Sequence, residues 1–162
     1  MHRILENYNP SVILCAYNSK PVFGNQITIT KKLLKQSISL AKLSKIPSNR
    51  IVLDPAIGFF RKTGSGKFFT KIKSDWANRD LLILQNLKSI KQGYPILVSV
   101  SNKSFIGKIL NKPNPADRLA GSLAAEVFSV ICGADIIRTH NVKETKEVVR
   151  IAHRLTRTNK SL

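Results

Sequence analysis

The sequence is poor in acidic side chains. Its 162 residues contain 9 Asp and Glu against 27 Lys and Arg, which gives a formal net charge of +18. Such a charge attracts polyanions and speeds the approach of a phosphorylated ligand. The basic residues are scattered and form neither a block nor a stripe interleaved with aromatic rings. A lysine-rich surface is the simpler interpretation, so nucleic-acid binding is kept as an alternative and the purpose of the charge stays open.

Cysteine and long apolar runs are also scarce. Cys15 and Cys132 are the only cysteines, and neither belongs to a CxxC pair or has a histidine at metal-ligand spacing. This excludes a disulfide framework, and we expect two reduced core thiols and no metal held by the protein. No apolar run approaches the roughly 20 residues of a membrane span, and the amino terminus has neither a signal-peptide nor a transit-peptide pattern. A cytoplasmic location is the default prediction.

What the sequence does contain is a regular alternation of short and long apolar segments. With 43% hydrophobic and 22% charged residues it is typical of a single globular domain, residues 1–162 with a core at about 11–157. Runs at 11–17, 51–54, 95–100 and 134–139 predict strands, and segments at 28–45, 75–93, 114–133 and from 141 onward predict helices. The predicted fold class is α/β, with four successive βα units joined by right-handed crossovers.

The predicted helices have recognisable ends and apolar faces. Asp75 and Asn114 are expected N-caps, and Pro115 supports the second of them. Residues expected on the apolar faces are Leu33, Leu34, Ile38, Ala41 and Leu43 in the first helix, Leu119, Leu123, Val127 and Ile131 in the third, and Val148, Ala152 and Leu155 in the last.

A parallel sheet of this kind is either doubly wound or part of a (β/α)₈ barrel, and both bind ligands at the carboxyl ends of their strands. A complete barrel needs about 250 residues, so this length accounts for about half of one. Half a barrel leaves the strands at 11–17 and 134–139 as unpaired edges. We therefore expect a partner, either a second copy of the chain in a homodimer or a separate amino-terminal half-barrel chain. The alternative is a truncated gene or fragment.

Polar residues follow three of the four predicted strands. Because side chains alternate along a strand, Arg138 and His140 share a face, and together they suit a phosphate or pyrophosphate. An arginine paired with a carboxylate and a histidine bonded to backbone is an equally good interpretation of these two alone. Asp54 ends the second strand and can accept two N–H groups of a flat heterocycle, or cap a helix or pair with a lysine. Lys103 and Ser104 follow the third strand, where they can meet an anion or remain solvated.

These residues lie in motifs that resemble a known family. The stretches LDPAIGF (53–59), SNKSFIG (101–107) and IIRTHNV (136–142), with DRLAGSLAA (117–125) between the last two, resemble the carboxyl-terminal motifs of dihydropteroate synthase. The usual forms of these motifs read DPGIGFGK, SRKSFIG and RVHDV. The resemblance implies strands five to eight of a (β/α)₈ TIM barrel, the carboxyl-terminal half.

The family joins 6-hydroxymethyl-7,8-dihydropterin pyrophosphate to p-aminobenzoate, forming dihydropteroate and pyrophosphate. The resemblance implies that Asp54 binds the N–H edge of the pterin and Lys103 its acceptor atoms. Arg138 and His140 hold the leaving pyrophosphate, assisted by Mg²⁺ carried on that substrate. Ser104 and Phe59 bind the carboxylate and the ring of the aminobenzoate. Whether the chain is active by itself as an enzyme stays open.

Some positions depart from the family pattern. Ala56 and Phe60 stand where glycine is usual, Asn102 where arginine is usual, and Asn141 where aspartate is usual. The ring of Phe60 is expected to narrow the aminobenzoate entrance, so a different aniline acceptor is an alternative. A non-catalytic subunit that binds pterin or phosphate is a second alternative, and a basic nucleic-acid-binding protein is a third.

Overall fold

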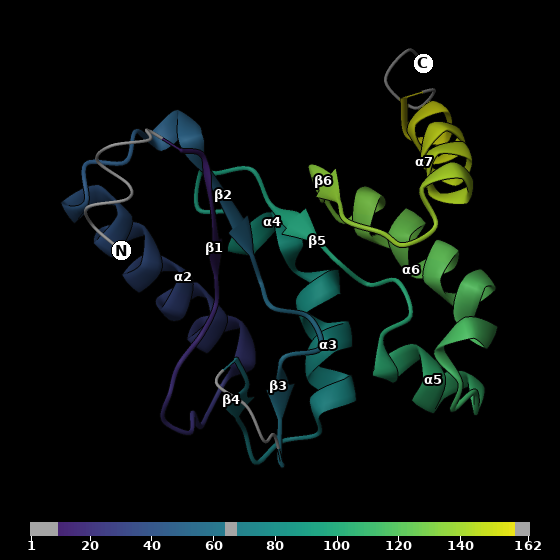
Figure 1. Cartoon of the computed structure of the whole chain (residues 1–162), viewed down its shortest axis with the longest axis horizontal. Helices are drawn as coiled ribbons and strands as arrows, with labels where there is room; N and C mark the ends of the chain where they lie inside the picture. The colour runs from purple at the N-terminus through teal and green to yellow at the C-terminus, as the bar shows by residue number, and fades with distance from the viewer. Residues whose placement is uncertain (1–9, 64–67, 158–162) are drawn as a thin grey trace.

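Parallel strands form the centre of the molecule. The computed structural model describes residues 10–63 and 68–157, so the outermost parts of the predicted domain, 1–9 and 158–162, lie outside the described residues. The central strands are β1 (Val12–Cys15), β2 (Ile51–Asp54), β5 (Leu97–Val98) and β6 (Ile136–Ile137). β1 pairs with β2 and β5 with β6, both in parallel, and a parallel bridge between Leu53 and Ile96 joins the two pairs. Figure 1 shows them in the order β1, β2, β5, β6.

Only β2 has the predicted bounds, and the other three strands are shorter. β6 begins later than predicted because the side chain of Asp135 occupies a backbone N–H group of the neighbouring segment. Asp135 accepts a hydrogen bond from the Ile96 amide at 2.8 Å through its carboxylate, and its own amide donates to the Ile96 carbonyl at 3.0 Å. The sheet is nevertheless closely packed, because Leu53, Ile96 and Val98 are all 0% exposed.

The helices pack around these strands. They are α2 (Gln26–Leu43), α3 (Trp76–Gln85), α4 (Leu87–Ile90), α5 (Ser104–Leu110), α6 (Leu119–Ile131) and α7 (Val142–Arg157), with short 3₁₀ turns η1 (Ser48–Arg50) and η2 (Pro115–Arg118). The predicted caps are confirmed: Asp75 accepts from the amides of Ala77 and Asn78, and Asn114 from the amide of Ala116. α2 begins two residues before its predicted start, because Asn25 caps it by accepting from the Thr28 amide.

The predicted buried face of α2 is correct except at its end, whereas in α7 only Ala152 of the three predicted residues is buried and Val148 is partly buried. Leu33, Leu34, Ile38 and Ala41 are buried in α2, and Ala152 in α7. Leu43 and Leu155, by contrast, are 78% and 68% exposed. Both lie in the last turn of their helix. There the expected apolar spacing continues beyond the part of the helix that packs on neighbouring elements, which for α7 means α6.

The orientation of α6 differs from the prediction. Its buried residues are polar, namely Ser122, Glu126 and Ser129, whereas Leu119 and Ile131 of the predicted apolar face are 38% and 49% exposed. Hydrogen bonds explain how the polar face is accommodated, since Ser122 Oγ accepts from the Asn102 amide at 2.9 Å and Glu126 Oε2 accepts from Thr145 Oγ1 at 2.7 Å. Buried polar groups are tolerated when they are bonded in this way.

A small parallel pair was not predicted at all. β3 (Phe60–Arg61) pairs with β4 (Thr70–Lys71), and a bridge between Val22 and Ile72 extends this pairing toward the segment after β1. The intervening glycine-rich residues 64–67 lie outside the described ranges. Within the part of the chain that the structure describes, no helix is both long and apolar enough to cross a membrane.

Candidate functional site

Asp54 is the last residue of β2 and lies at the carboxyl edge of the sheet. Its side chain is turned back toward the following turn, where Oδ1 accepts a hydrogen bond of 2.7 Å from the Ala56 amide. The residue is 8% exposed. Burial raises the pKa of this carboxyl, while the Ala56 bond and the charges of Arg138 and Lys103 act in the opposite direction.

Lys103 follows β5 and immediately precedes α5. Its ammonium lies 4.4 Å from the centroid of the Phe59 ring, so the predicted ligand-binding lysine and aromatic ring are in contact. Burial lowers the pKa of Lys103, and the nearby carboxylate of Asp54 counteracts this effect. Phe59 and Lys103, which follow different strands in the sequence, are therefore neighbours at the carboxyl edge of the sheet.

Gly58 makes this approach possible. It has a φ of +85°, and a Cβ atom at this position would lie 2.9 Å from Cδ of Lys103. Any larger residue would therefore be strained in its backbone and would push the lysine side chain away. The conformation of the turn after Asp54 and the position of the Lys103 side chain therefore depend on each other.

Arg138 and His140 continue from β6 at the same edge. The Arg138 amide bonds to the Val98 carbonyl at 2.9 Å, and its guanidinium is close enough to affect the pKa values of Asp54 and Lys103. Among the described residues, none of the ion pairs includes Arg138. His140 is held by Ser101, whose Oγ lies 2.8 Å from Nδ1.

Ser104 and Phe60 complete the comparison with the predicted site. Ser104 is the first residue of α5 and is exposed, so its hydroxyl is accessible beside Lys103. The expectation for Phe60 is wrong: the ring is 0% exposed and stacks on the guanidinium of Arg79, 3.7 Å from Cζ to the ring centroid. It therefore does not narrow the aminobenzoate entrance.

Cys15 also lies at this edge of the sheet, which corrects the expectation of a core thiol at this position, whereas Cys132 packs against the hydrophobic core. Cys15 is exposed and pairs in register with Asp54, while Cys132 is partly exposed. Burial of its sulfur, followed by the charge of Asp54, raises the pKa of Cys15 to about 11. The thiol form is thus favoured at neutral pH.

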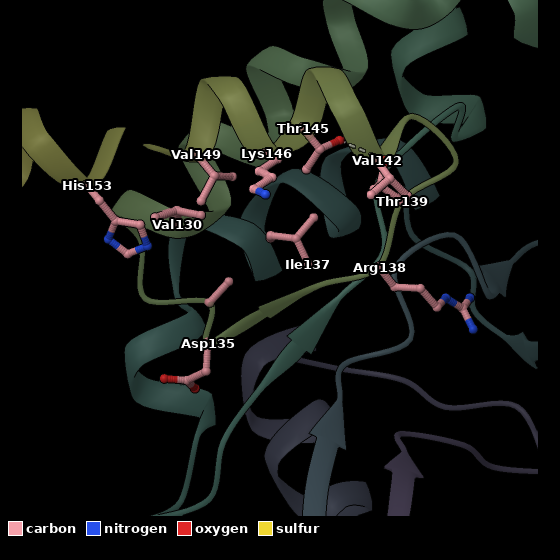
Figure 2. A pocket seen from close by; sticks show the side chains of 11 residues that line it. Val130, Asp135, Ile137, Arg138, Thr139, Val142, Thr145, Lys146, Val149 and His153 are labelled. Atoms are coloured by element: carbon pink, nitrogen blue, oxygen red, sulfur yellow. Dashed lines mark hydrogen bonds between the residues drawn. The ribbon is translucent and has the colours of Figure 1, made fainter. Parts of the chain in front are cut away.

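A separate cavity of about 720 Å³ lies between β6, α6 and α7. Figure 2 shows Ile137 facing this cavity while the side chain of Arg138, the next residue, extends away from it. Its lining includes Val149, Lys146 and His153. Arg138 is nevertheless one of the residues that line the cavity, so the cavity borders the group of residues around Asp54.

The residues around Asp54 fit an anion better than a protein-bound metal ion. No group of three or more potential metal-ligating side chains is found in residues 10–63 and 68–157. Lys103 and Arg138 are cationic neighbours of the single carboxylate, and they would repel a divalent cation while attracting a diphosphate.

The sequence reasoning missed a buried ion pair near Asp54 and Lys103. Arg79 and Asp80, consecutive residues of α3, are 2% and 0% exposed, and Arg79 Nη1 lies 3.1 Å from Asp80 Oδ1. Burial is the main cause that lowers the pKa of Arg79 to about 10 and raises that of Asp80. The available signal was two charged residues next to each other on the core-facing side of an amphipathic helix.

Comparison with known families and proteins gives consistent matches. The family model described as "Pterin binding enzyme" matches residues 1–140. The dihydropteroate synthase of Synechocystis sp. is 32% identical over 136 residues, which cover 83% of this chain and 42% of the relative. The mitochondrial folate synthesis bifunctional protein of Pisum sativum is 33% identical over 147 residues, covering 88% of this chain and 27% of that protein.

Solved structures show the same similarity. The dihydropteroate synthase of Coxiella burnetii, solved in complex with pteroic acid, superimposes with a TM-score of 0.77 and 34% identity over 93% of this chain and 53% of that one. The Yersinia pestis dihydropteroate synthase gives a TM-score of 0.76 and 28% identity over 93% and 56% of the two chains. The chain thus spans about half the length of these solved relatives.

Proposed function

The chain belongs to the pterin-binding enzyme family, and from this membership we propose that it binds a pterin pyrophosphate at the carboxyl ends of β2, β5 and β6. Its similarity to dihydropteroate synthases supports a function of that type. The proposed reaction joins 6-hydroxymethyl-7,8-dihydropterin pyrophosphate to p-aminobenzoate or a related aniline in folate biosynthesis. The observation that carries this proposal is the position of Asp54, Lys103 and Arg138 at or shortly after the carboxyl ends of β2, β5 and β6, close enough for the charges of Lys103 and Arg138 to act on the pKa of Asp54.

The pterin end of the site is built from Asp54 and Lys103. One oxygen of Asp54 accepts the Ala56 amide, and the carboxylate retains acceptor capacity for the 2-amino and ring N–H groups of a pterin. Lys103 donates to acceptor atoms of the same ring. A planar heterocycle with donors on one edge and acceptors on the other suits this pair of opposite charges.

The pyrophosphate end is built from Arg138 and His140. The fork of Arg138 can give two parallel hydrogen bonds to the diphosphate, and His140, oriented by Ser101, can donate a further one. As the bond between the pterin methylene and the diphosphate oxygen breaks, its electron pair leaves with the diphosphate and these donors stabilise the new charge. The aniline nitrogen then bonds to the methylene carbon and releases a proton.

Ser104 and Phe59 are assigned to the aminobenzoate. Phe59 is partly buried and already in contact with Lys103, so its ring can flank a second aromatic ring. Ser104 presents an exposed hydroxyl for the carboxylate. Mg²⁺ enters this scheme as a counter-ion of the substrate diphosphate, because the cationic surroundings of Asp54 do not suit a metal held by the chain itself.

We also assign the four central strands to strands five to eight of an eight-stranded barrel. Their parallel order and the match to about half of each solved relative support this assignment. Among the described strands, β1 and β6 each have one paired neighbour, so each leaves a free edge. A second copy of the chain or a separate half-barrel chain would cover these edges.

Calorimetric titration with the pterin pyrophosphate tests the proposal. Asp54→Asn should abolish binding, whereas the matched substitution Asp117→Asn, at an exposed aspartate of η2, should leave it unchanged. Binding that ignores Asp54→Asn and falls steeply with salt would instead indicate general polyanion binding, for which the net charge of +18 is the one supporting observation.

Turnover separates an enzyme from a binding subunit. We expect formation of dihydropteroate from p-aminobenzoate, measured with the chain alone and with an added amino-terminal half of a relative. Tight pterin binding without turnover under both conditions would contradict the enzymatic part of the proposal and favour the non-catalytic alternative.

A further inference from the structure

The turn that follows β2, residues 55–58, connects the residues of the pterin end with Phe59, which is assigned to the aminobenzoate. Asp54 precedes it, Phe59 follows it, and Gly58 within it packs against the side chain of Lys103. The conformation of this turn therefore sets the relative positions of all three side chains. Whatever holds the turn also shapes the site.

The turn is strained. Ala56 has a φ of +57°, in the left-handed region that glycine adopts freely and alanine avoids. Glycine is the usual residue here in the family pattern to which LDPAIGF is similar. Such a conformation persists only where the surrounding structure imposes it.

Two adjacent side chains of α3 impose it. Arg79 donates from Nη2 to the Pro55 carbonyl at 2.8 Å and from Nη1 to the Ala56 carbonyl at 3.2 Å. Asp80 accepts from the Gly58 amide at 3.0 Å through Oδ2. Three backbone groups of a four-residue turn are thus bonded to one pair of side chains.

The pair is itself firmly placed. The Arg79 guanidinium stacks on Phe60 and donates to Thr30 Oγ1 at 3.1 Å, while Asp80 Oδ2 also lies 3.6 Å from Arg61 Nη1. Phe60, the residue after Phe59, stands where the family pattern usually has glycine. Its ring packs on the guanidinium of Arg79 and so helps to hold this side chain in place. The planar guanidinium of Arg79 can stack on a ring and donate several hydrogen bonds at the same time, which the ammonium of a lysine cannot do.

We propose that Arg79 and Asp80 are positioning residues for the pterin end of the site, holding residues 55–58 so that Asp54 and Lys103 face one ligand, with the ring of Phe59 beside them. This inference rests on the proposed function. Neither residue touches the ligand. Their effect on affinity arises because, without them, the binding-competent turn is only partly populated.

The test uses two variants of the full chain. The double substitution Arg79→Met with Asp80→Leu replaces the pair by apolar residues of similar size, a change that often preserves folding. Arg79→Lys is the milder variant, which retains the charge beside Asp80 but loses the fork. Ile90→Ala is the matched control, because Ile90 is 0% exposed in α4 and its truncation lowers stability without touching the turn.

Two ligands are titrated by calorimetry at a temperature where all variants remain folded. The double variant should bind the pterin pyrophosphate weaker by about tenfold or more, and Arg79→Lys should fall between it and the unaltered chain. Inorganic pyrophosphate should bind all of them equally, because Arg138 and His140 do not depend on the turn. Ile90→Ala should change neither affinity. Equal loss for both ligands, or no loss for the pterin ligand, would overturn the inference.

Amide hydrogen exchange supplies a readout without any ligand. The Ala56 and Gly58 amides should exchange faster in the double variant, and Ala56→Gly added to Arg79→Lys should recover pterin affinity by relieving the strain. Unchanged exchange at both amides refutes the inference. If the unaltered chain binds no pterin pyrophosphate, the proposed function fails, and the exchange rates still decide whether the pair holds the turn.

Discussion

At the scale of single residues, the burial of Asp54 has a direct consequence for pH dependence. Burial raises its pKa above the ordinary 3.8, so the carboxylate needed for the pterin is lost at a higher pH than for an exposed aspartate. We expect affinity for the pterin pyrophosphate to fall as the pH drops through this raised pKa. Calorimetry at a series of pH values should show the fall, whereas Asp54→Asn should show no binding at any of these pH values. A pH profile unaffected by Asp54→Asn would assign the titration to another group.

The raised pKa of Asp54 affects folding stability in the opposite direction to ligand affinity, because it favours the folded state at low pH. Because the folded state binds the Asp54 proton more tightly than the unfolded state does, this residue favours folding at low pH. Its contribution is present below the unfolded pKa and is lost as the pH rises through the folded pKa. Asp54→Asn should therefore raise the melting temperature above that pH while it removes ligand binding, which is a common compromise at a functional site.

Phe60 gives a second prediction at this scale. The ring is fully buried and stacks on Arg79, so Phe60→Ala leaves a cavity and exposes one face of a buried charge. We expect the free energy of unfolding in urea to fall by about 3–5 kcal/mol. Phe68→Ala, at a ring that is 76% exposed, is the control and should change it little. A small effect of Phe60→Ala would mean that the stacking contributes little.

At the scale of elements, Asp75 links two helices. It caps α3 and accepts a hydrogen bond of 2.9 Å from Lys108 of α5, and this bond is the main reason why its pKa is lowered to about 2. A lowered pKa contributes stability above the unfolded value, which is lost as the pH falls through the folded one. Asp75→Ala should lower the melting temperature at neutral pH, and the difference from the unaltered chain should shrink between about pH 4 and about 2.

Asp75→Asn separates the two contributions of this side chain. It retains an oxygen that can cap α3 and loses the charge that pairs with Lys108. Its melting temperature at neutral pH should lie between those of Asp75→Ala and the unaltered chain. A value equal to that of Asp75→Ala would show that the contact with Lys108 accounts for the whole effect.

The elements also show what the sequence could predict. Local chemistry was sufficient for β2, for the caps at Asp75 and Asn114, and for most of the buried face of α2. It failed for α6, because periodicity locates an apolar stripe without saying which side of the helix meets the sheet. The bonds of Ser122 to the Asn102 amide and of Glu126 to Thr145 depend on residues distant in sequence.

The candidate site was predictable to a similar degree. The position of Asp54 at a strand end and the placement of Arg138 on the opposite face from Ile137 follow from strand geometry and motif order. The Arg79–Asp80 pair, the strained Ala56 and the burial of Phe60 do not, because they arise from contacts between α3 and a turn more than 20 residues away. The pairing of β3 with β4 was missed because each strand has only two residues, too few for an alternation of polar and apolar side chains to be recognised.

At the scale of the whole molecule, the free edges of β1 and β6 make association the central question. If a second copy covers an edge, sedimentation at micromolar concentration should give a mass above that of the monomer. Ile13→Lys places a charge on the exposed side of β1, where Ile13 is 53% exposed, and should abolish association through this edge. Leu43→Lys, at a leucine of α2 that is 78% exposed, should not. A monomer at every concentration would eliminate the homodimer and leave the separate half-barrel chain or a truncated gene.

The contacts among Ala56, Phe60 and Arg79 also limit the routes by which this sequence can change. Without its hydrogen bonds to the carbonyls of residues 55 and 56, Arg79 would be a buried cation with few partners. Without Arg79, Ala56 would lose the hydrogen bonds that help to hold its strained backbone conformation. Mutational effects at these sites are therefore expected to be epistatic. In an ancestor with glycine at position 56, the arginine would have to precede the alanine. For reversion, the easiest order is to restore glycine at position 56 first and to replace Arg79 afterwards.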